Sequence, residues 1–156
     1  MKKYIIVFLI SMVPLIELRG AIPYAVARSL NMPISYAIAI VGNMLPVPII
    51  FFFARKVLIW GKDKKLTGKF FTFCLEKGEH GGEKLKAKDG KGLYFALFLF
   101  VGIPLPGTGA WTGTLAASIL DLDFKKSTAA AMGGVVLAGI IMGLVSFLVK
   151  GAVGAM

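Results

Sequence analysis

Two ionisable residues stand alone inside the first apolar stretch of this chain. Glu17 and Arg19 are the only charged residues between Lys3 and Arg28. A charge at the depth of a bilayer core costs about 2.5–3.5 kcal/mol on insertion scales, so such a side chain usually faces a partner or a water-filled cavity. We interpret Glu17 as a protonatable carboxylate and Arg19 as a fixed anion-binding guanidinium. A structural ion pair, or a position in the headgroup layer, would also explain the two charges.

A second candidate lies in the break Pro104-Leu105-Pro106-Gly107-Thr108-Gly109. Prolines remove amide donors and glycines permit left-handed angles, so this stretch does not suit a regular helix. If a helix begins near Ala110, its first amides point back into the break and favour an anion there. The candidate binding residues are Pro106, Gly107, Thr108, Gly109, Trp111 and Thr112. A tight loop satisfied by its own turn hydrogen bonds is the alternative, and Trp111 could line a cavity or anchor at the membrane interface.

Asn43 is the third candidate, within Gly42-Asn43-Met44-Leu45-Pro46-Val47-Pro48. A buried amide must find hydrogen-bond partners, so Asn43 either caps broken backbone or binds a cargo molecule. The residues assigned to structural hinges are Pro14, Gly20, Pro23 and Pro104.

The elements that position these residues are apolar enough for a membrane. Of 156 residues 57% are hydrophobic, and the mean hydropathy is +0.80. The ranges Ile34–Ala54 and Thr128–Val149 carry no charge, and each would reach roughly 32 Å as a helix, enough to cross a bilayer core. We therefore expect an all-α, multi-pass protein of the cell membrane, with the Met1–Ser11 start retained rather than cleaved as a signal peptide.

The positive charge is concentrated in one connector. Eleven of the eighteen Lys and Arg residues lie between Arg55 and Lys91, where five acids are interspersed. This is the distribution of a cytoplasmic loop, and it argues against nucleic-acid binding. The loop, residues 57–91, is either a solvated connector or a basic amphipathic helix on anionic lipid headgroups. Its Cys74 and His80 are interpreted as surface residues, because neither has a partner spacing for zinc or a disulfide.

The two ends of the chain resemble each other, which predicts one membrane domain (1–156) made of repeat 1 (1–56) and repeat 2 (92–156). An offset of about 90 residues aligns Tyr4, Phe8, Pro14, Gly20 and Gly42 with Tyr94, Phe98, Pro104, Gly109 and Gly133. Each half has two short apolar runs around a hinge, Glu17–Pro23 in the first half, followed by one full span. The short runs reach only about 20 Å as helices.

Each short pair is therefore either a re-entrant hairpin or one kinked crossing. Hairpins give an odd number of crossings per half and invert the second repeat, as in many secondary transporters. Kinked crossings give four transmembrane helices, two of them broken. We favour hairpins, because each break falls near the middle of its pair.

No motif indicates an enzyme, a metal site or a cofactor, and the lack of a P-loop argues against ATP-driven transport. The stretches Glu17–Pro23, Gly42-Asn43 and Pro104–Gly113 resemble the small multidrug export family of prokaryotic membrane proteins. That family is similar to the wider DedA group, and the resemblance implies two re-entrant hairpins with two spans and a role in moving lipids or drugs. The DedA pattern has arginines around its second hairpin proline, whereas Leu99–Gly109 has none here.

The sequence thus predicts a secondary transporter or flippase for small amphipathic, drug-like molecules or lipid-linked anions. In this hypothesis Glu17 couples protons, and Arg19 with the Pro106–Gly109 loop holds the cargo. The other hypothesis is a non-transporting membrane scaffold or assembly factor with structural hinges. A homodimer is expected, because two spans and two hairpins would hardly enclose a pathway.

Overall fold

The computed structural model describes residues 2–14, 16–62, 90–105 and 107–154, and every element in these ranges is a helix. The helices are α1 (Lys2–Met12), α2 (Glu17–Ala27), α3 (Met32–Met44), α4 (Pro46–Lys62), α6 (Gly90–Gly102), α7 (Ala110–Ile119) and α8 (Phe124–Gly154). The loop around Cys74 and His80, with its expected amphipathic segment, lies largely outside the described residues. Helix α4 continues to Lys62, six residues beyond the end predicted for repeat 1.

Two stretches are long and apolar enough to cross a membrane. They are Met32–Phe53, which combines α3 with the start of α4, and Phe124–Ala152 in α8, with mean hydropathies of 2.0 and 2.4. Only 33% of the most apolar part of the first stretch and 22% of that of the second are buried. The core helix of a soluble protein would be mostly buried. Large side chains such as Leu144 and Leu148 are exposed by 63% and 73%. Length, composition and exposure together indicate a membrane protein.

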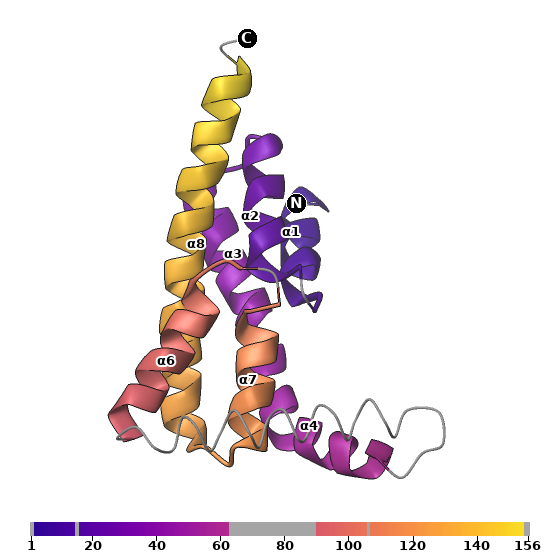
Figure 1. Ribbon diagram of the computed structural model, residues 1–156. Coiled ribbons are helices and arrows are strands. Elements are labelled where there is room, and N and C mark those ends of the chain that lie inside the picture. The colour runs from indigo at the N-terminus through magenta and orange to yellow at the C-terminus, as the bar shows by residue number, and fades with distance from the viewer. Residues whose placement is uncertain (1, 15, 63–89, 106, 155–156) are drawn as a thin grey trace.

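The short helices pair as hairpins whose ends return to the same place. The Tyr4 hydroxyl accepts a hydrogen bond of 3.3 Å from the backbone N–H of Asn31, so the start of α1 lies beside the start of α3. The Tyr94 hydroxyl accepts one of 3.2 Å from the N–H of Asp123, which joins α6 to the start of α8 in the same manner. In Figure 1 the α1–α2 pair occupies the upper part of the molecule and the α6–α7 pair the lower part, and their tips meet at mid-height.

We call α1 and α6 the outer arms of the hairpins and α2 and α7 the inner arms. The two inner arms end with the same backbone geometry. The N–H of Leu30 bonds to the carbonyl of Ala25, and the N–H of Leu122 bonds to that of Ala117, both at 3.0 Å. The intervening Ser29 and Asp121 have φ angles of 51° and 53°. Asn31 and Asp123 then cap the following helix through their side-chain oxygens. The halves therefore correspond at an offset of 92 residues from the inner arm onward.

This correspondence corrects the sequence alignment of the repeats. The sequence aligns Gly20 with Gly109 and Gly42 with Gly133, whereas the structure makes Gly134 the equivalent of Gly42. A Cβ at Gly42 would lie 2.8 Å from the carbonyl oxygen of Phe8, and a Cβ at Gly134 would lie 2.7 Å from that of Phe98. The turn between α6 and α7 has seven residues and the turn between α1 and α2 has four. The offset between the halves therefore changes at this turn, from 90 residues at Tyr4 and Tyr94 to 92 residues at Leu30 and Leu122.

The prediction of a hinge at Glu17–Pro23 is wrong, because these residues form most of α2. The first break lies earlier, at Val13–Ile16, and it contains Pro14. Gly20 and Pro23 are inside the helix. A single proline removes only the hydrogen bond to the residue four positions earlier, and packing of α2 compensates for that loss. Pro104 does lie in the second break.

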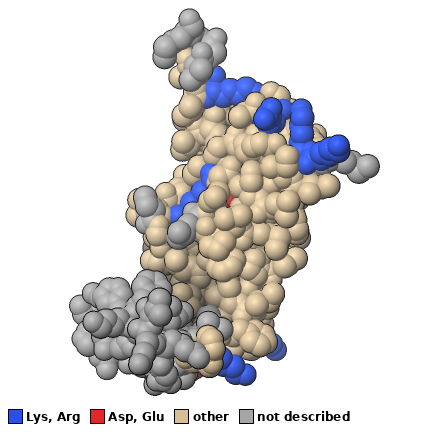
Figure 2. Space-filling model, turned by 90° about the vertical axis from the view of Figure 1, so that its right-hand side faces the viewer, with Lys and Arg blue, Asp and Glu red and all other residues tan. Residues whose placement is uncertain are grey.

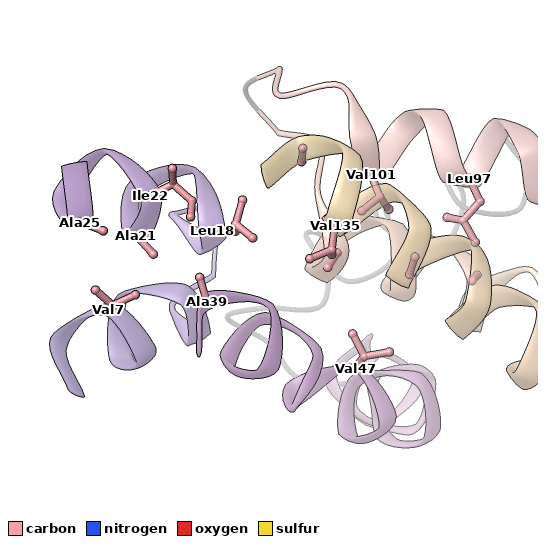
Figure 3. Close-up of a cluster of buried hydrophobic side chains, with 14 residues drawn as sticks. Val7, Leu18, Ala21, Ile22, Ala25, Ala39, Val47, Leu97, Val101 and Val135 are labelled. Atoms are coloured by element: carbon pink, nitrogen blue, oxygen red, sulfur yellow. The ribbon is translucent and has the colours of Figure 1, made fainter. Parts of the chain in front are cut away.

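The inner arms exchange partners between the halves. Helix α1 packs on α3 and α6 on α8, but α2 also packs on α8 and α7 on α4. Figure 3 shows the resulting core, in which Leu18 and Ile22 of α2 and Val135 of α8 belong to one cluster of buried side chains. All three are at most 1% exposed. One continuous core therefore fixes the tips of both hairpins against each other.

Candidate functional site at the hairpin tips

Glu17, the first residue of α2, places its carboxylate on the N-terminus of α7. The side chain is 3% exposed. Its Oε2 accepts a hydrogen bond of 3.1 Å from the N–H of Ala110, and its Oε1 accepts one of 2.9 Å from Trp111. A helix N-terminus favours an anion through its free amides and its dipole. The anion site expected at these amides is therefore occupied by a carboxylate of the same chain.

Backbone conformation at the two tips makes this contact feasible. Glu17 has a left-handed φ of 52°, and Gly109, its equivalent at the offset of 92, has a φ of 131°. A Cβ at Gly109 would overlap the Glu17 carboxylate. Only glycine suits Gly109, both for its φ and for the space that the carboxylate needs.

Arg19 binds the break that follows α6. Its guanidinium donates to the carbonyl of Leu105, to the hydroxyl of Thr108 at 2.7 Å and to the carbonyl of Ile103 at 3.4 Å. Because α6 ends at Gly102, carbonyls in this break lack helical partners, and a guanidinium satisfies them well. The Nε atom of Arg19 is buried and has no hydrogen-bond partner among the described residues.

The break also satisfies part of its own backbone, as the tight-loop alternative expected. The Thr108 hydroxyl lies 2.9 Å from the carbonyl of Ile103 and 2.8 Å from that of Leu105. The N–H of Thr108 bonds to the same Leu105 carbonyl at 3.2 Å. The Thr108 hydroxyl can accept a hydrogen bond from Arg19 while it donates one to a carbonyl of the turn. Thr108 therefore links Arg19 to the backbone of the turn.

Three further residues of α3 and α7 carry buried polar atoms. Asn43, 2% exposed, contacts the Glu17 carboxylate through its side chain. Within the described residues, the Asn43 Oδ1, the Trp111 Nε1 and the Thr114 Oγ1 are buried without hydrogen-bond partners. Sequence reasoning did not single out Thr114, a buried hydroxyl four residues after Ala110 on α7.

The remaining candidates lie further from this cluster. The Thr112 hydroxyl donates to the Gly109 carbonyl of its own helical turn at 3.4 Å. Gly107 is exposed, and nothing lies within 4 Å of the position that its Cβ would take. Pro106 lies outside the described residues.

Together these contacts form a clasp, which we define as Glu17 on α7 and Arg19 on the turn after α6. Both charges come from the first half, and both bond to the second half rather than to each other. In Figure 2 charged side chains gather at the two ends of an apolar body, with one small charged patch between them at mid-height. In the described ranges no group of three His, Cys, Asp or Glu residues could hold a metal ion. The chemistry that the clasp offers is exchange of one proton and rearrangement of charge-assisted hydrogen bonds.

Comparison with protein families gives one match. The family model described as "Putative small multi-drug export protein" matches residues 17–141, a range that begins at Glu17 and includes α7 and most of α8. Comparisons with curated proteins and with solved structures gave no significant match. The match covers well over half of the chain and includes both sides of the clasp, so the protein belongs to this small multi-drug export family.

Proposed function

We propose that the protein is a secondary membrane transporter that exports small amphipathic, drug-like molecules. The observation that carries this proposal is the Glu17 carboxylate, buried at the meeting point of the two hairpins. It occupies a left-handed position with a φ of 52°, where the other half has a glycine. Keeping an acidic side chain at a strained and buried position is costly, and such positions concentrate at functional sites. The family match supports an export role.

In this proposal the hairpins are re-entrant and the second half is inverted. Helices α1 and α2 have 11 residues each, which gives about 17 Å, too little to cross a core of about 30 Å. Their outer ends meet through the Tyr4 and Asn31 contact, so the pair enters and leaves on one side. The other pair does so at the opposite end of α8. The positive charge of the loop 57–91 supports a cytoplasmic position for that opposite end.

Proton coupling follows from the nature of the clasp. The ionised carboxylate accepts from two amides of α7, and both contacts are charge-assisted. A proton on Glu17 would remove the charge and place an O–H donor among N–H donors. Protonation should therefore loosen the contact between the hairpins and shift the population toward an open state.

The cargo would bind where the clasp opens. Arg19 is committed to carbonyls and to Thr108 while the tips are joined. An anionic group, including that of a lipid-linked anion, would compete with these carbonyls for the guanidinium and would bind it most fully after the turn at Leu105 moves away. Release of the turn frees the Arg19 charge, so binding of such a group and opening are linked.

Reconstitution tests the proposal through Glu17→Gln. We expect at least a tenfold loss of transport driven by a pH gradient, because glutamine cannot exchange the proton. The measurement is efflux of an amphipathic fluorescent dye from vesicles containing equal amounts of protein. Asp123→Asn is the matched control: it removes one carboxylate but retains an N-cap, as Asn31 shows at the equivalent position. Full, pH-dependent transport by Glu17→Gln would rule out coupling at this residue.

A non-transporting membrane scaffold is the second candidate, and one observation favours it. Glu17 and Arg19 find most of their partners within the chain, as a purely structural clasp would. In that case Arg19→Ala would lower the abundance of the protein, and dye efflux at equal abundance would match that of the unmodified protein. In the transporter, efflux falls even when abundance is equalised.

A homodimer remains part of the transporter proposal, because the described residues of one chain supply only two long spans. The mass of the protein in a detergent micelle, measured by light scattering, tests this point. Two chains per particle would support a shared pathway, and one chain per particle would exclude it.

A further inference from the structure

A groove lies between the end of α2 and the C-terminal part of α8, away from the clasp. Its volume is about 570 Å³, and it is lined by Pro23, Val26, Ala27, Met142, Val145, Ser146, Val149 and Lys150. Helix α2 ends at Ala27 while α8 continues to Gly154. The last turns of α8 therefore have no helix of the first hairpin beside them, and the slim Pro23 and Ala27 leave space at the end of α2.

The groove is apolar along its length and cationic at one end. Lys150 Nζ donates to the carbonyl of Val26 at 3.1 Å and to the Ser29 hydroxyl at 2.9 Å. Both acceptors are neutral, so these contacts do not compensate the ammonium charge, and they leave its third N–H unused. Arg28, close by in the chain, lies over the Tyr24 ring at 5.7 Å rather than on a carboxylate.

Negative charge among the described residues is remote from this end. Glu17 is at the hairpin tips, and Asp121 and Asp123 are at the start of α8. Lys2 and Lys3 begin α1, whose start lies beside Asn31 and hence near Arg28. Figure 2 shows the Lys and Arg side chains gathered at this end of the molecule. The mouth of the groove therefore complements an anion.

The depth of Lys150 suits a headgroup. About 36 Å of helix separates it from Lys126 at the start of α8, slightly more than the roughly 30 Å of a bilayer core. Lys150 thus falls just outside the core, while Val145 and Met142 fall inside it. The groove is apolar inside the bilayer core and has a cation, Lys150, at the edge of the core. This arrangement suits a molecule with an anionic headgroup and an acyl chain.

We propose that this groove binds an anionic phospholipid of the surrounding bilayer. One acyl chain lies between α2 and α8, and the phosphate sits at Lys150, with Arg28 nearby. This lipid would tie the first hairpin to the long helix at the end opposite the basic loop. The site is separate from the clasp and does not depend on the transport proposal.

Native mass spectrometry of the full-length protein in detergent tests the site by titration with phosphatidylglycerol and, separately, with phosphatidylcholine. Lys150→Gln removes the charge, and Lys125→Gln, an exposed lysine at the other end of α8, is the control with an equal change in net charge. Ala27→Phe fills the groove without changing charge, at a position that is exposed and so tolerates a larger side chain.

We expect tighter binding of phosphatidylglycerol than of phosphatidylcholine. Lys150→Gln should weaken the phosphatidylglycerol adduct about fivefold, the effect of one lysine near an anionic headgroup, and Lys125→Gln should leave that adduct unchanged. Ala27→Phe should weaken the adducts of both lipids. The proposal is overturned if the two lipids bind equally, if the two lysine variants behave alike, or if Ala27→Phe binds lipid as well as the unmodified protein.

Discussion

At the scale of single residues, two charged side chains at the hairpin tips are stabilised by backbone groups inside an apolar protein. Glu17 bonds to the amides that begin α7, where the helix dipole amounts to about half a positive charge. Arg19 bonds to carbonyls left open by the end of α6. The two side chains therefore do not need each other as partners, and each joins the first half to a different end of the second break.

The first prediction concerns Gly109, whose missing Cβ makes room for the Glu17 carboxylate. We expect Gly109→Ala to lower the free energy of unfolding by about 2–5 kcal/mol, the sum of left-handed strain and overpacking. Thermal unfolding in detergent measures the effect. Gly107→Ala is the control, because Gly107 has a φ of 79° but open space around it, so only the strain of about 1–2 kcal/mol remains. Equal losses in both variants would show that the carboxylate contact does not contribute.

At the scale of elements, each outer arm holds the start of the following long helix. Tyr4 and Tyr94 do this with equivalent hydrogen bonds to the cap residues Asn31 and Asp123. The outer arms then approach the long helices at Gly42 and Gly134. These repeated contacts fix the outer arm of each hairpin, while the inner arm is free to pack across onto the other half.

Tyr4→Phe and Tyr94→Phe should each destabilise the protein by about 1 kcal/mol, because each removes one acceptor from a backbone N–H. Unfolding midpoints in the same detergent provide the measurement. Tyr24→Phe is the control, since the ring that Arg28 overlies is retained, and we expect it to be neutral. A clear difference between the Tyr4 and Tyr94 variants would contradict the structural equivalence of the halves.

Gly42→Ala and Gly134→Ala should separate α1 from α3 and α6 from α8. The added Cβ would lie 2.8 or 2.7 Å from a backbone carbonyl oxygen that cannot easily move. Such overpacking costs about 1–3 kcal/mol. Gly143→Ala, with nothing within 4 Å of its Cβ position, should be neutral or slightly stabilising through helix propensity. Thermal unfolding of all three variants in the same detergent provides the measurement. An unchanged stability of Gly42→Ala would contradict the close approach of α1 to α3.

At the scale of the whole molecule, two hairpins meet tip to tip beside two long helices (Figure 1). The inner arms α2 and α7 each pack on a long helix of the other half. Separation of the halves would therefore expose both inner arms at once. This cross-packing makes the clasp the natural point at which a small change in charge could alter the arrangement of the hairpins.

Cysteine labelling tests the hairpin topology in a protein that lacks Cys74. Cysteines at Lys2 and Met32 should react with an impermeant maleimide from one side of the membrane, and those at Gly92 and Leu122 from the other. The reason is that the start of each hairpin lies beside the start of the following long helix, as the proposed re-entrant topology requires. Labelling of positions 2 and 32 from opposite sides would instead support kinked crossings.

The sequence by itself determined the features that depend on local composition. Uncharged runs of sufficient length predicted both long spans, and the glycines and prolines after Ile103 predicted the second break and the start of α7 at Ala110. The isolated charges identified Glu17 and Arg19 as the residues of interest. Each of these features follows from hydropathy, backbone freedom or the cost of burying charge, which neighbouring residues alone reveal.

Only the tertiary structure decided what the charges contact. The sequence placed Glu17–Pro23 in a hinge, but packing against α1 and α8 holds the segment as helix α2 despite Pro23. The free amides of α7 looked like a site for a foreign anion, yet they hold Glu17, 93 residues away in the chain. Contacts of that separation depend on how the two hairpins meet, and a change of offset from 90 to 92 residues at the second turn was enough to conceal the register of the halves.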